Sequence, residues 1–448
     1  MKLVVITSFQ ILLVGGFHVC IQYFLSVHPP WVSTMTLTHA LRQNLLLDLF
    51  STHRHLGDEV LVSLNRRDQE ALLNLATEHR MLPMLYWRLQ HERKSIDVPD
   101  WIQKKLQNQF RKQNVLALKW QHELFHIHHI FKQSNIPYLA LKGAYLAVHA
   151  YPQPGLRPLR DLDILVHKEQ VFFAYQKLLS EGLNPLVTLG HDLTAVAQAR
   201  HHLPPLQSQQ GIHVELHLRL HSPVKNPGVA DLAESEGLWR RSIYPTTATV
   251  PIPYMSPTDL VLHMIVHGTF DHKFDNGPLL LSDLAYLLQT HTINWPLFWS
   301  LAESTHTTSG CILALHMLEY YFGKQDISWP RPVGYKPAAL VEHTAALMLR
   351  DFRRRMDVNL ASDAAKAGSA FNRLRFYFSR FFTAKTVVAT EFHIPTNSPW
   401  IYFYYLKRWR RQLISRLPNY LFVVRKRRLR TEIQNMEALS DYLFDQGK

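Results

Sequence analysis

The sequence predicts an α+β protein in which a small α/β unit lies between two helical segments. Apolar residues recur at helical spacing over residues 36–134. Between residues 136 and 220 the pattern changes to short β-type runs separated by Gly and Pro, with one helical stretch at 169–180. Helical spacing returns after Pro257. These three observations define the expected fold class.

The predicted boundaries follow these changes of pattern. Leucines at helical spacing, such as Leu41, Leu45 and Leu49, define the first helical region, with Pro83 and Pro99 as breaks. The predicted units are a leader at 1–34, an N-terminal helical region at 35–135, a sheet-containing core at 136–222, a C-terminal helical domain at 223–400 and a basic aromatic tail at 401–448.

The composition is that of a globular chain that folds without disulfides. Of 448 residues, 47% are hydrophobic and 19% are charged, which excludes the disordered and collagen-like classes. The two cysteines, Cys20 and Cys311, are too few for a disulfide framework or a four-thiolate metal site. We therefore expect a reducing compartment, the cytoplasm.

Residues 1–34 are an apolar-biased leader whose nature the sequence leaves open. Polar residues interrupt the run, so it makes a poor membrane span, and no clear cleavage site follows it. An ordinary amphipathic segment begins at Met35. The leader is thus either untranslated, with the true start at Met35, or a signal or anchor segment.

Basic residues are concentrated near the carboxyl end. The chain has 49 Lys and Arg against 35 Asp and Glu, a net charge of +14. Over residues 402–430 cations are interleaved with aromatic side chains such as Tyr402 and Trp409. Nucleic-acid binders and interfacial helices share this pattern, so we expect an anionic membrane surface or a nucleic acid as a partner, and with the former a peripheral membrane location. A solvated helix face over a core is the alternative.

The first part of the chemically informative region is a turn at Lys142 and Gly143. A β-type run at 138–141 enters this turn, and a helical stretch follows it. Such a turn directs backbone N–H groups toward a phosphate, and Lys142 adds a positive charge. By itself the arrangement is typical of an ordinary turn.

A pair of carboxylates stands on the next predicted strand. Because side chains alternate along a strand, Asp161 and Asp163 share one face, while Leu162 and Ile164 point to the other. Neighbouring carboxylates repel unless a cation lies between them, so the pair favours one or two Mg²⁺ ions. An exposed strand edge with two acids is the alternative.

A third carboxylate follows on a strand predicted at 211–218. Apolar and polar residues alternate there, which places His213, Glu215 and His217 on the polar face. From a neighbouring strand, Glu215 would reach the same ions as the two aspartates. A surface role for this residue is the alternative.

Together these motifs resemble a known family. The Lys142-Gly143 turn, the paired aspartates and the later strand acid look like the DNA polymerase β-type nucleotidyltransferase superfamily. The stretches LALKGAYLA, YPQPGLRPLRDLDILV and VELHLRL are similar to the bacterial family described as uncharacterised nucleotidyltransferases. The resemblance covers residues 136–220, and more weakly 257–303. It implies a minimal palm, a small mixed sheet with helices, as the nucleotidyltransferase core.

The resemblance also implies a reaction. A nucleoside monophosphate would move from an NTP, in the first place ATP, to a hydroxyl-bearing acceptor, with release of pyrophosphate. Asp161 and Asp163 would bridge two Mg²⁺ ions, and Glu215 would ligate the ion that activates the hydroxyl. The acceptor, a small molecule or a protein, is not defined. AMP transfer to a protein, as in some toxin–antitoxin pairs, and a catalytically silent nucleotide- or membrane-binding module are the alternatives.

The phosphate loop departs from the wider superfamily, which usually has Gly-Ser where this chain has Gly143 and Ala144. Without the serine hydroxyl, Lys142 is expected to supply the phosphate contact electrostatically. Arg157 and Arg160 precede the aspartates, where a guanidinium can clamp a triphosphate through two hydrogen bonds. Salt bridges from these arginines to the same acids are the alternative.

Two histidine-rich patterns suggest other chemistry. Residues His122 to His126 read His-Glu-x-x-His, which on a helix brings two histidines to one face for Zn²⁺. No third ligand is identifiable, so we interpret them as a histidine-rich helix face beside the α/β unit. A second set comprises His263, His267, Asp271 and His272. We interpret it mainly as helix packing or capping, with a metal or substrate contact as the alternative.

Overall fold

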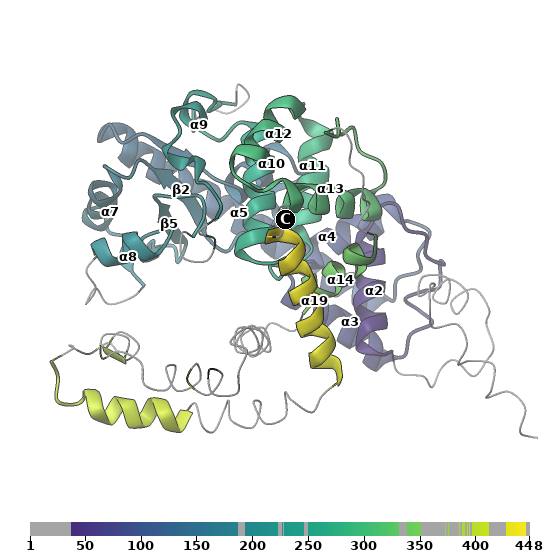
Figure 1. Ribbon diagram of the computed structural model, residues 1–448. Helices are drawn as coiled ribbons and strands as arrows, with labels where there is room; N and C mark the ends of the chain where they lie inside the picture. Colours follow the sequence, from purple (N-terminus) through teal and green to yellow (C-terminus); the bar gives the residue numbers. More distant parts are fainter. Residues whose placement is uncertain are drawn as a thin grey trace, which may run out of the picture.

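The structure is a computed structural model that describes most of the chain. It covers residues 37–186, 193–222, 226, 228–245, 250–330, 338–350, 397–411 and 427–444, with single residues between 372 and 394. The predicted leader at 1–34 lies outside the described residues, as does the 412–426 part of the basic tail. Figure 1 shows the sheet with its own helices on one side of the molecule and the later helices beside it.

A five-stranded mixed sheet forms the centre of the α/β unit, with the order β1-β2-β5-β4-β3. β2 runs parallel to β5 and antiparallel to β1, and β4 pairs antiparallel with β3 and β5. The small mixed sheet between helical segments confirms the predicted α+β class. The strands are β1 (Tyr138–Ala140), β2 (Leu162–Val166), β3 (Asn184–Pro185), β4 (Leu206–Gln207) and β5 (His213–His217).

The pairing of β2 with β5 follows from their alternating patterns. Leu162 lies opposite Val214 and Ile164 opposite Leu216, and all four side chains are buried. Because side chains alternate along a strand, burying this apolar face fixes the register of the polar residues between them. The polar side chains of the two strands are thereby brought to paired positions.

Four helices of the α/β unit surround the sheet. The long helix α5 (Asp100–Gln133) contacts both α6 (Gly143–His149) and α7 (Val171–Ser180). In α7 the buried residues Val171, Ala174, Tyr175 and Leu178 recur at helical spacing, and this helix contacts β5. The fourth helix, α8 (Leu193–Ala199), follows β3 along the chain and was not predicted.

Three shorter helices precede α5 in the N-terminal helical region. They are α2 (His39–Phe50), α3 (Arg66–Glu78) and α4 (Leu82–Trp87), followed by the π-helical turn η2 (Arg88–Glu92). Thr38 caps α2 and Asn65 caps α3, each accepting a hydrogen bond from a backbone N–H of the first turn. Pro83 lies in the first turn of α4 and Pro99 is the N-cap of α5, so both prolines stand at helix starts.

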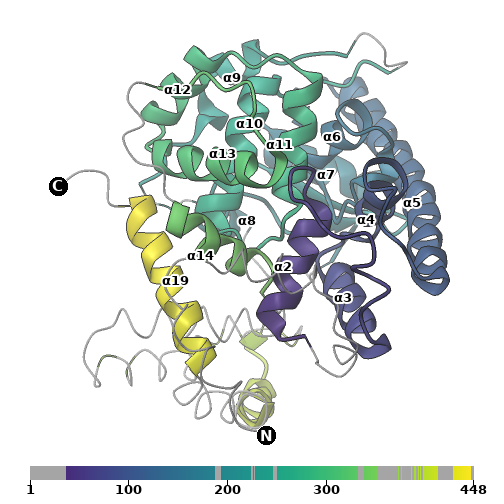
Figure 2. The same cartoon turned by 90° about the vertical axis from the view of Figure 1, so that its right-hand side faces the viewer.

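After Pro257 the described residues are mainly helical, as predicted. Helix α10 contacts α11, α12 and α13, and Figure 2 shows α19 alongside α14, which it contacts. Met436, Leu439 and Leu443 of α19 are buried in the same core as Leu45 of α2. The helices are α9 (Glu236–Arg240), α10 (Pro257–Val266), the π-helical turn η5 (His267–Asp271), α11 (Leu279–Thr290), α12 (Trp295–Ser304), α13 (Thr308–Phe322), α14 (Ala338–Met348) and α19 (Arg427–Phe444).

The described part of the basic segment includes a helix at 401–411. Its apolar side chains Tyr402, Phe403 and Leu406 are 61%, 55% and 61% exposed. Across the residues that the structure describes, none of the helices is both long enough and apolar enough to cross a bilayer.

Candidate active site

The carboxylates of Asp163 and Glu215 stand at directly paired positions on β2 and β5. Ligand atoms of Asp163, Glu215 and His217 all lie within 4.8 Å of one another, and no other such group occurs in the described ranges. Two acids at paired strand positions repel each other. The pair is therefore stable only where positive charge is supplied between or beside the carboxylates.

Lys142 and His217 supply that charge. Lys142 Nζ lies 3.0 Å from Asp163 Oδ2, and His217 Nε2 lies 3.1 Å from Asp163 Oδ1. Burial works against ionisation of Asp163, but the charges of Lys142 and His217 outweigh it and hold its pKa well below the ordinary value. Burial likewise opposes protonation of His217, yet Asp163 and Glu215 raise its pKa to about 9.

The backbone at Lys142 explains how its side chain reaches β2. Lys142 has φ 44° and ψ −112°, a conformation that favours glycine and strains other residues. It joins β1 to α6, and the preceding Leu141 N–H donates to the carbonyl of Asp163 at 2.9 Å. The strained turn is thus tied to β2 and directs the ammonium group toward the carboxylates.

Asp161 lies one residue before β2 and beside the other acids. Burial, together with the charges of Asp163 and Glu215, raises the pKa of Asp161 to about 7. Asp161 is not part of the compact group formed by Asp163, Glu215 and His217. The structure therefore brings two of the three predicted acids into contact distance and leaves the third at the edge of the group.

Arg157 forms an ion pair with Asp283, whereas the sequence predicted a contact with the triphosphate or salt bridges to Asp161 and Asp163. Its guanidinium donates from Nη2 to Asp283 Oδ2 at 2.8 Å and from Nε to Asp283 Oδ1 at 2.9 Å. Tyr151 donates to the same carboxylate at 2.7 Å. Both side chains of the ion pair are mostly buried, at 15% and 5% exposure. Arg157 thus fastens the loop before β2 to helix α11, whereas Arg160 is exposed.

Gly143 is required by packing at the start of α6. A Cβ atom on Gly143 would lie 2.3 Å from Leu159 Cδ2 and 3.2 Å from Arg157 Nη1. The absence of a side chain lets the loop that carries Arg157 lie against α6. This contact gives Gly143 a structural role in addition to any contact with phosphate.

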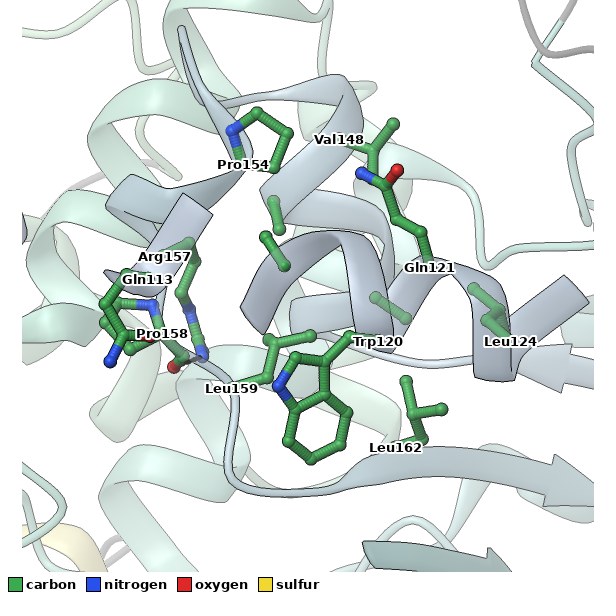
Figure 3. Close-up of a pocket in the computed structure, with 13 residues that line it drawn as sticks. Gln113, Trp120, Gln121, Leu124, Val148, Pro154, Arg157, Pro158, Leu159 and Leu162 are labelled. Carbon is green, nitrogen blue, oxygen red and sulfur yellow. Dashed lines mark hydrogen bonds between the residues drawn. The ribbon is translucent and has the colours of Figure 1, made fainter. Parts of the chain in front are cut away.

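A small cavity lies behind this loop, between α5, α6 and the start of β2. Figure 3 shows Trp120, Leu159 and Leu162 among its lining side chains. Its volume is about 20 Å³, enough for about one water molecule and far too small for a nucleotide. The residues that line it are Gln113, Ala117, Trp120, Gln121, Leu124, Ala144, Ala147, Val148, Pro154, Arg157, Pro158, Leu159 and Leu162.

Sequence reasoning missed the histidines of the site. His217 was placed on the polar face of its strand but given no role, although it lies two residues after Glu215 and so on the same face. The rings of His201 and His202 lie 5.2 and 5.4 Å from the ring of His217. His202 Nε2 is also 3.6 Å from Glu215 Oε2. No spacing pattern links the loop at 201–202 to β5, so a role for these two histidines in the site could not be predicted from the sequence.

The His-Glu-x-x-His pattern on α5 does not gather ligands. His122 and His126 are exposed, and Glu123 is buried. His122 Nδ1 lies 2.9 Å from Gln210 Nε2, and His126 Nδ1 lies 3.4 Å from Glu123 Oε1. Further along the helix, His128 Nδ1 lies 2.9 Å from the hydroxyl of Tyr138 on β1. The helix face therefore packs beside the sheet, in keeping with the preferred interpretation.

A small mixed sheet with paired acids on adjacent strands, facing a lysine turn, is consistent with a nucleotidyltransferase palm. The chain belongs to the family described as uncharacterised nucleotidyltransferase, whose model matches residues 65–323, more than half of the chain. The match runs from the cap of α3 to the end of α13, and so reaches further than the motifs alone indicated. No curated protein matches the chain. The family identifies the protein as a transferase.

Proposed function

We propose that the protein transfers a nucleoside monophosphate from an NTP, preferentially ATP, to a hydroxyl-bearing acceptor in a Mg²⁺-dependent reaction. The observation that carries the proposal is the direct pairing of Asp163 with Glu215 on adjacent strands, with Asp161 beside them and Lys142 opposite. Membership of a nucleotidyltransferase family supports the same reaction class.

The donor atoms of the site suit a divalent cation. Carboxylate oxygens are preferred by Mg²⁺, and a half-buried pair of acids with a third nearby supplies the negative charge that such ions require. We assign Asp161, Asp163 and Glu215 as the residues that hold up to two ions. When bound, these cations neutralise charge on the triphosphate and on the pyrophosphate that leaves.

Lys142 Nζ pairs with Asp163 Oδ2, so its ammonium group would compete with any divalent cation that the carboxylates hold. With the carboxylates neutralised in that way, the charge of Lys142 would be available for a phosphate oxygen of the NTP. His217 Nε2 lies on the other oxygen of Asp163 and orients that carboxylate.

The two arginines are assigned different tasks. Arg160 is exposed beside the acids, and we assign it the contact with the triphosphate. Arg157 has its guanidinium bound to Asp283, so we assign it the positioning of the loop that carries Arg160. Gly143 supports the same loop through its contact with Leu159.

The acceptor and further partners belong to the proposal as well. We infer a small molecule or a protein as acceptor, the two classes that the resemblance leaves open. The exposed side chains of Tyr402, Phe403 and Leu406, followed by cations such as Lys407 and Arg411, support an anionic membrane surface as a partner, with a nucleic acid as the alternative.

In the test, purified protein is added to a cell lysate together with each of the four α-labelled NTPs in turn, and Mg²⁺-dependent transfer of the label is measured. Label on a small molecule, a protein or RNA identifies the acceptor class, and label on a protein supports the AMP-transfer alternative. Asp163→Asn provides the matched control. A folded protein that neither transfers label nor binds nucleotide in the presence of Mg²⁺ would favour the catalytically silent binding module.

A further inference from the structure

A second cluster of buried polar side chains lies next to the carboxylate site. Asp271 ends the π-helical turn η5, which begins with His267 directly after α10. His221 comes from the segment that follows β5. The side chains of His221 and Asp271 are 7% and 2% exposed, and that of His267 is 20% exposed. π-helical turns inserted in longer helices are frequent at functional sites.

Two imidazole nitrogens approach the same carboxylate oxygen without a hydrogen bond. His267 Nδ1 lies 3.4 Å and His221 Nδ1 lies 3.6 Å from Asp271 Oδ2. All three atoms are shielded from solvent and lack a hydrogen-bond partner. N–H···O bonds span about 2.7–3.2 Å, whereas two ligands at about 2.1 Å from a tetrahedral zinc ion are about 3.4 Å apart. The two distances fit ligands of a shared ion better than hydrogen bonds.

The other oxygen of Asp271 is held in place by the protein. Asn226 Nδ2 donates to Asp271 Oδ1 at 2.6 Å, and the backbone N–H of Ser222 lies 3.5 Å from the same atom. These contacts orient the carboxylate so that Oδ2 faces the two histidines. Hydrogen bonds of this kind, from groups behind a ligand, are typical of metal sites.

His263 stands beside the two histidines and lacks partners for its ring. It is 2% exposed, and neither of its ring nitrogens forms a hydrogen bond. Its ring centroid lies 5.7 Å from that of His221 and 6.1 Å from that of His267. Both ring nitrogens of His263 are therefore available to a ligand within this cluster.

We propose that His221, His267 and Asp271 bind one zinc-class transition-metal ion, with His263 as the fourth ligand. Two or three imidazoles with one carboxylate suit zinc, whereas Mg²⁺ prefers oxygen ligands. In the described ranges the ligand atoms of the Asp163 group alone lie within 4.8 Å of one another throughout, so binding an ion at the second set requires its side chains to move closer together.

The ion would join two parts of the fold. It links the end of α10 to the segment after β5, the strand that carries Glu215. The two sites are neighbours, because Lys142 pairs with Asp163 and its charge also acts on His263 and His267. Zinc at the second site would therefore stabilise the wall of the carboxylate site without using its ligands.

The test begins with the wild-type protein, stripped with a chelator and then titrated with Zn²⁺ and Co²⁺. We expect one tightly bound Zn²⁺ per chain, the visible absorption of tetrahedral Co²⁺, and a rise in Tm of about 5 °C on reloading. A folded wild-type chain that binds no Zn²⁺, or a Co²⁺ complex without tetrahedral absorption, overturns the proposal.

Variants then locate the ion. His267→Gln and Asp271→Asn are expected to weaken Zn²⁺ binding by about 100-fold or more. Asp163→Asn, which removes the proposed Mg²⁺ site, and His126→Ala, which removes an exposed histidine, retain it. Wild-type affinity in folded His267→Gln contradicts the assignment. Because Zn²⁺ binding is measured without NTP, its failure is distinct from failure of the proposed transferase activity.

Discussion

The ion pair between Arg157 and Asp283 provides a quantitative test of how the loop before β2 is held. Three hydrogen bonds from Arg157 and one from Tyr151 reach the Asp283 carboxylate. Asp283→Asn keeps the shape of the side chain but leaves the guanidinium buried without a counter-charge. Breaking a buried pair in this way costs about 3–5 kcal/mol.

That cost corresponds to a fall in Tm of roughly 3–5 °C, using about 1 °C per kcal/mol for a chain of 448 residues. Differential scanning calorimetry measures it directly. Glu236→Gln is the matched control, because it removes one partner of the exposed pair between Arg240 and Glu236 and should barely change Tm.

A double-mutant cycle separates the pair from its surroundings. Arg157→Leu combined with Asp283→Leu removes both charges, and the double variant is expected to be more stable than either single variant. If the losses of the two single variants simply add, or if Asp283→Asn melts within about 1 °C (about 1 kcal/mol) of wild type, Arg157 is not held by Asp283 as described.

Three further outcomes are expected. Lys142→Met should bind Mn²⁺ about tenfold more tightly in calorimetry, because the internal competitor for Asp163 is removed; weaker binding would argue against competition. The raised pKa of His217, about 9, means that its contribution to stability is complete below its ordinary pKa of 6.5 and is lost as the pH rises through 9. The Tm of wild type in chelator should thus fall more between pH 6.5 and 9.5 than that of His217→Gln, and equal slopes would contradict the charged histidine. His126→Ala should leave bound zinc, determined by elemental analysis, unchanged.

The positions of the acids on β2 and β5 were predictable from the sequence, because apolar and polar residues alternate along both strands. Buried Leu162 and Ile164 on one strand, and Val214 and Leu216 on the other, leave only one face for the acids. Pairing the two strands then brings Asp163 and Glu215 together. This chain of inference needs only the period of a strand and the repulsion of like charges.

Other features depend on contacts that no local pattern contains. The strands β3 and β4 have two residues each, too few to show a period. One of the short β-type runs predicted between residues 136 and 220 is 183–189. Its described strand is Asn184–Pro185, and 187–189 lies outside the described residues.

The partners of Arg157 and Lys142 could not be predicted from the sequence either. Arg157 and Asp283 are separated by 126 residues. The positive φ of Lys142, which aims its ammonium group at Asp163, occurs at a residue type that rarely adopts it. Tertiary structure, rather than sequence spacing, decides both contacts.

The most direct test of the central claim is the rate of label transfer from α-labelled ATP, with Mg²⁺ and with chelator, for wild type, Asp163→Asn and Glu215→Gln. Circular dichroism and Tm verify that each variant is folded. If the paired carboxylates form the catalytic centre, wild type transfers label only with Mg²⁺, and the rate of transfer falls by about 100-fold or more in each variant. Transfer that persists in either folded variant, or that does not require a divalent cation, would contradict this assignment.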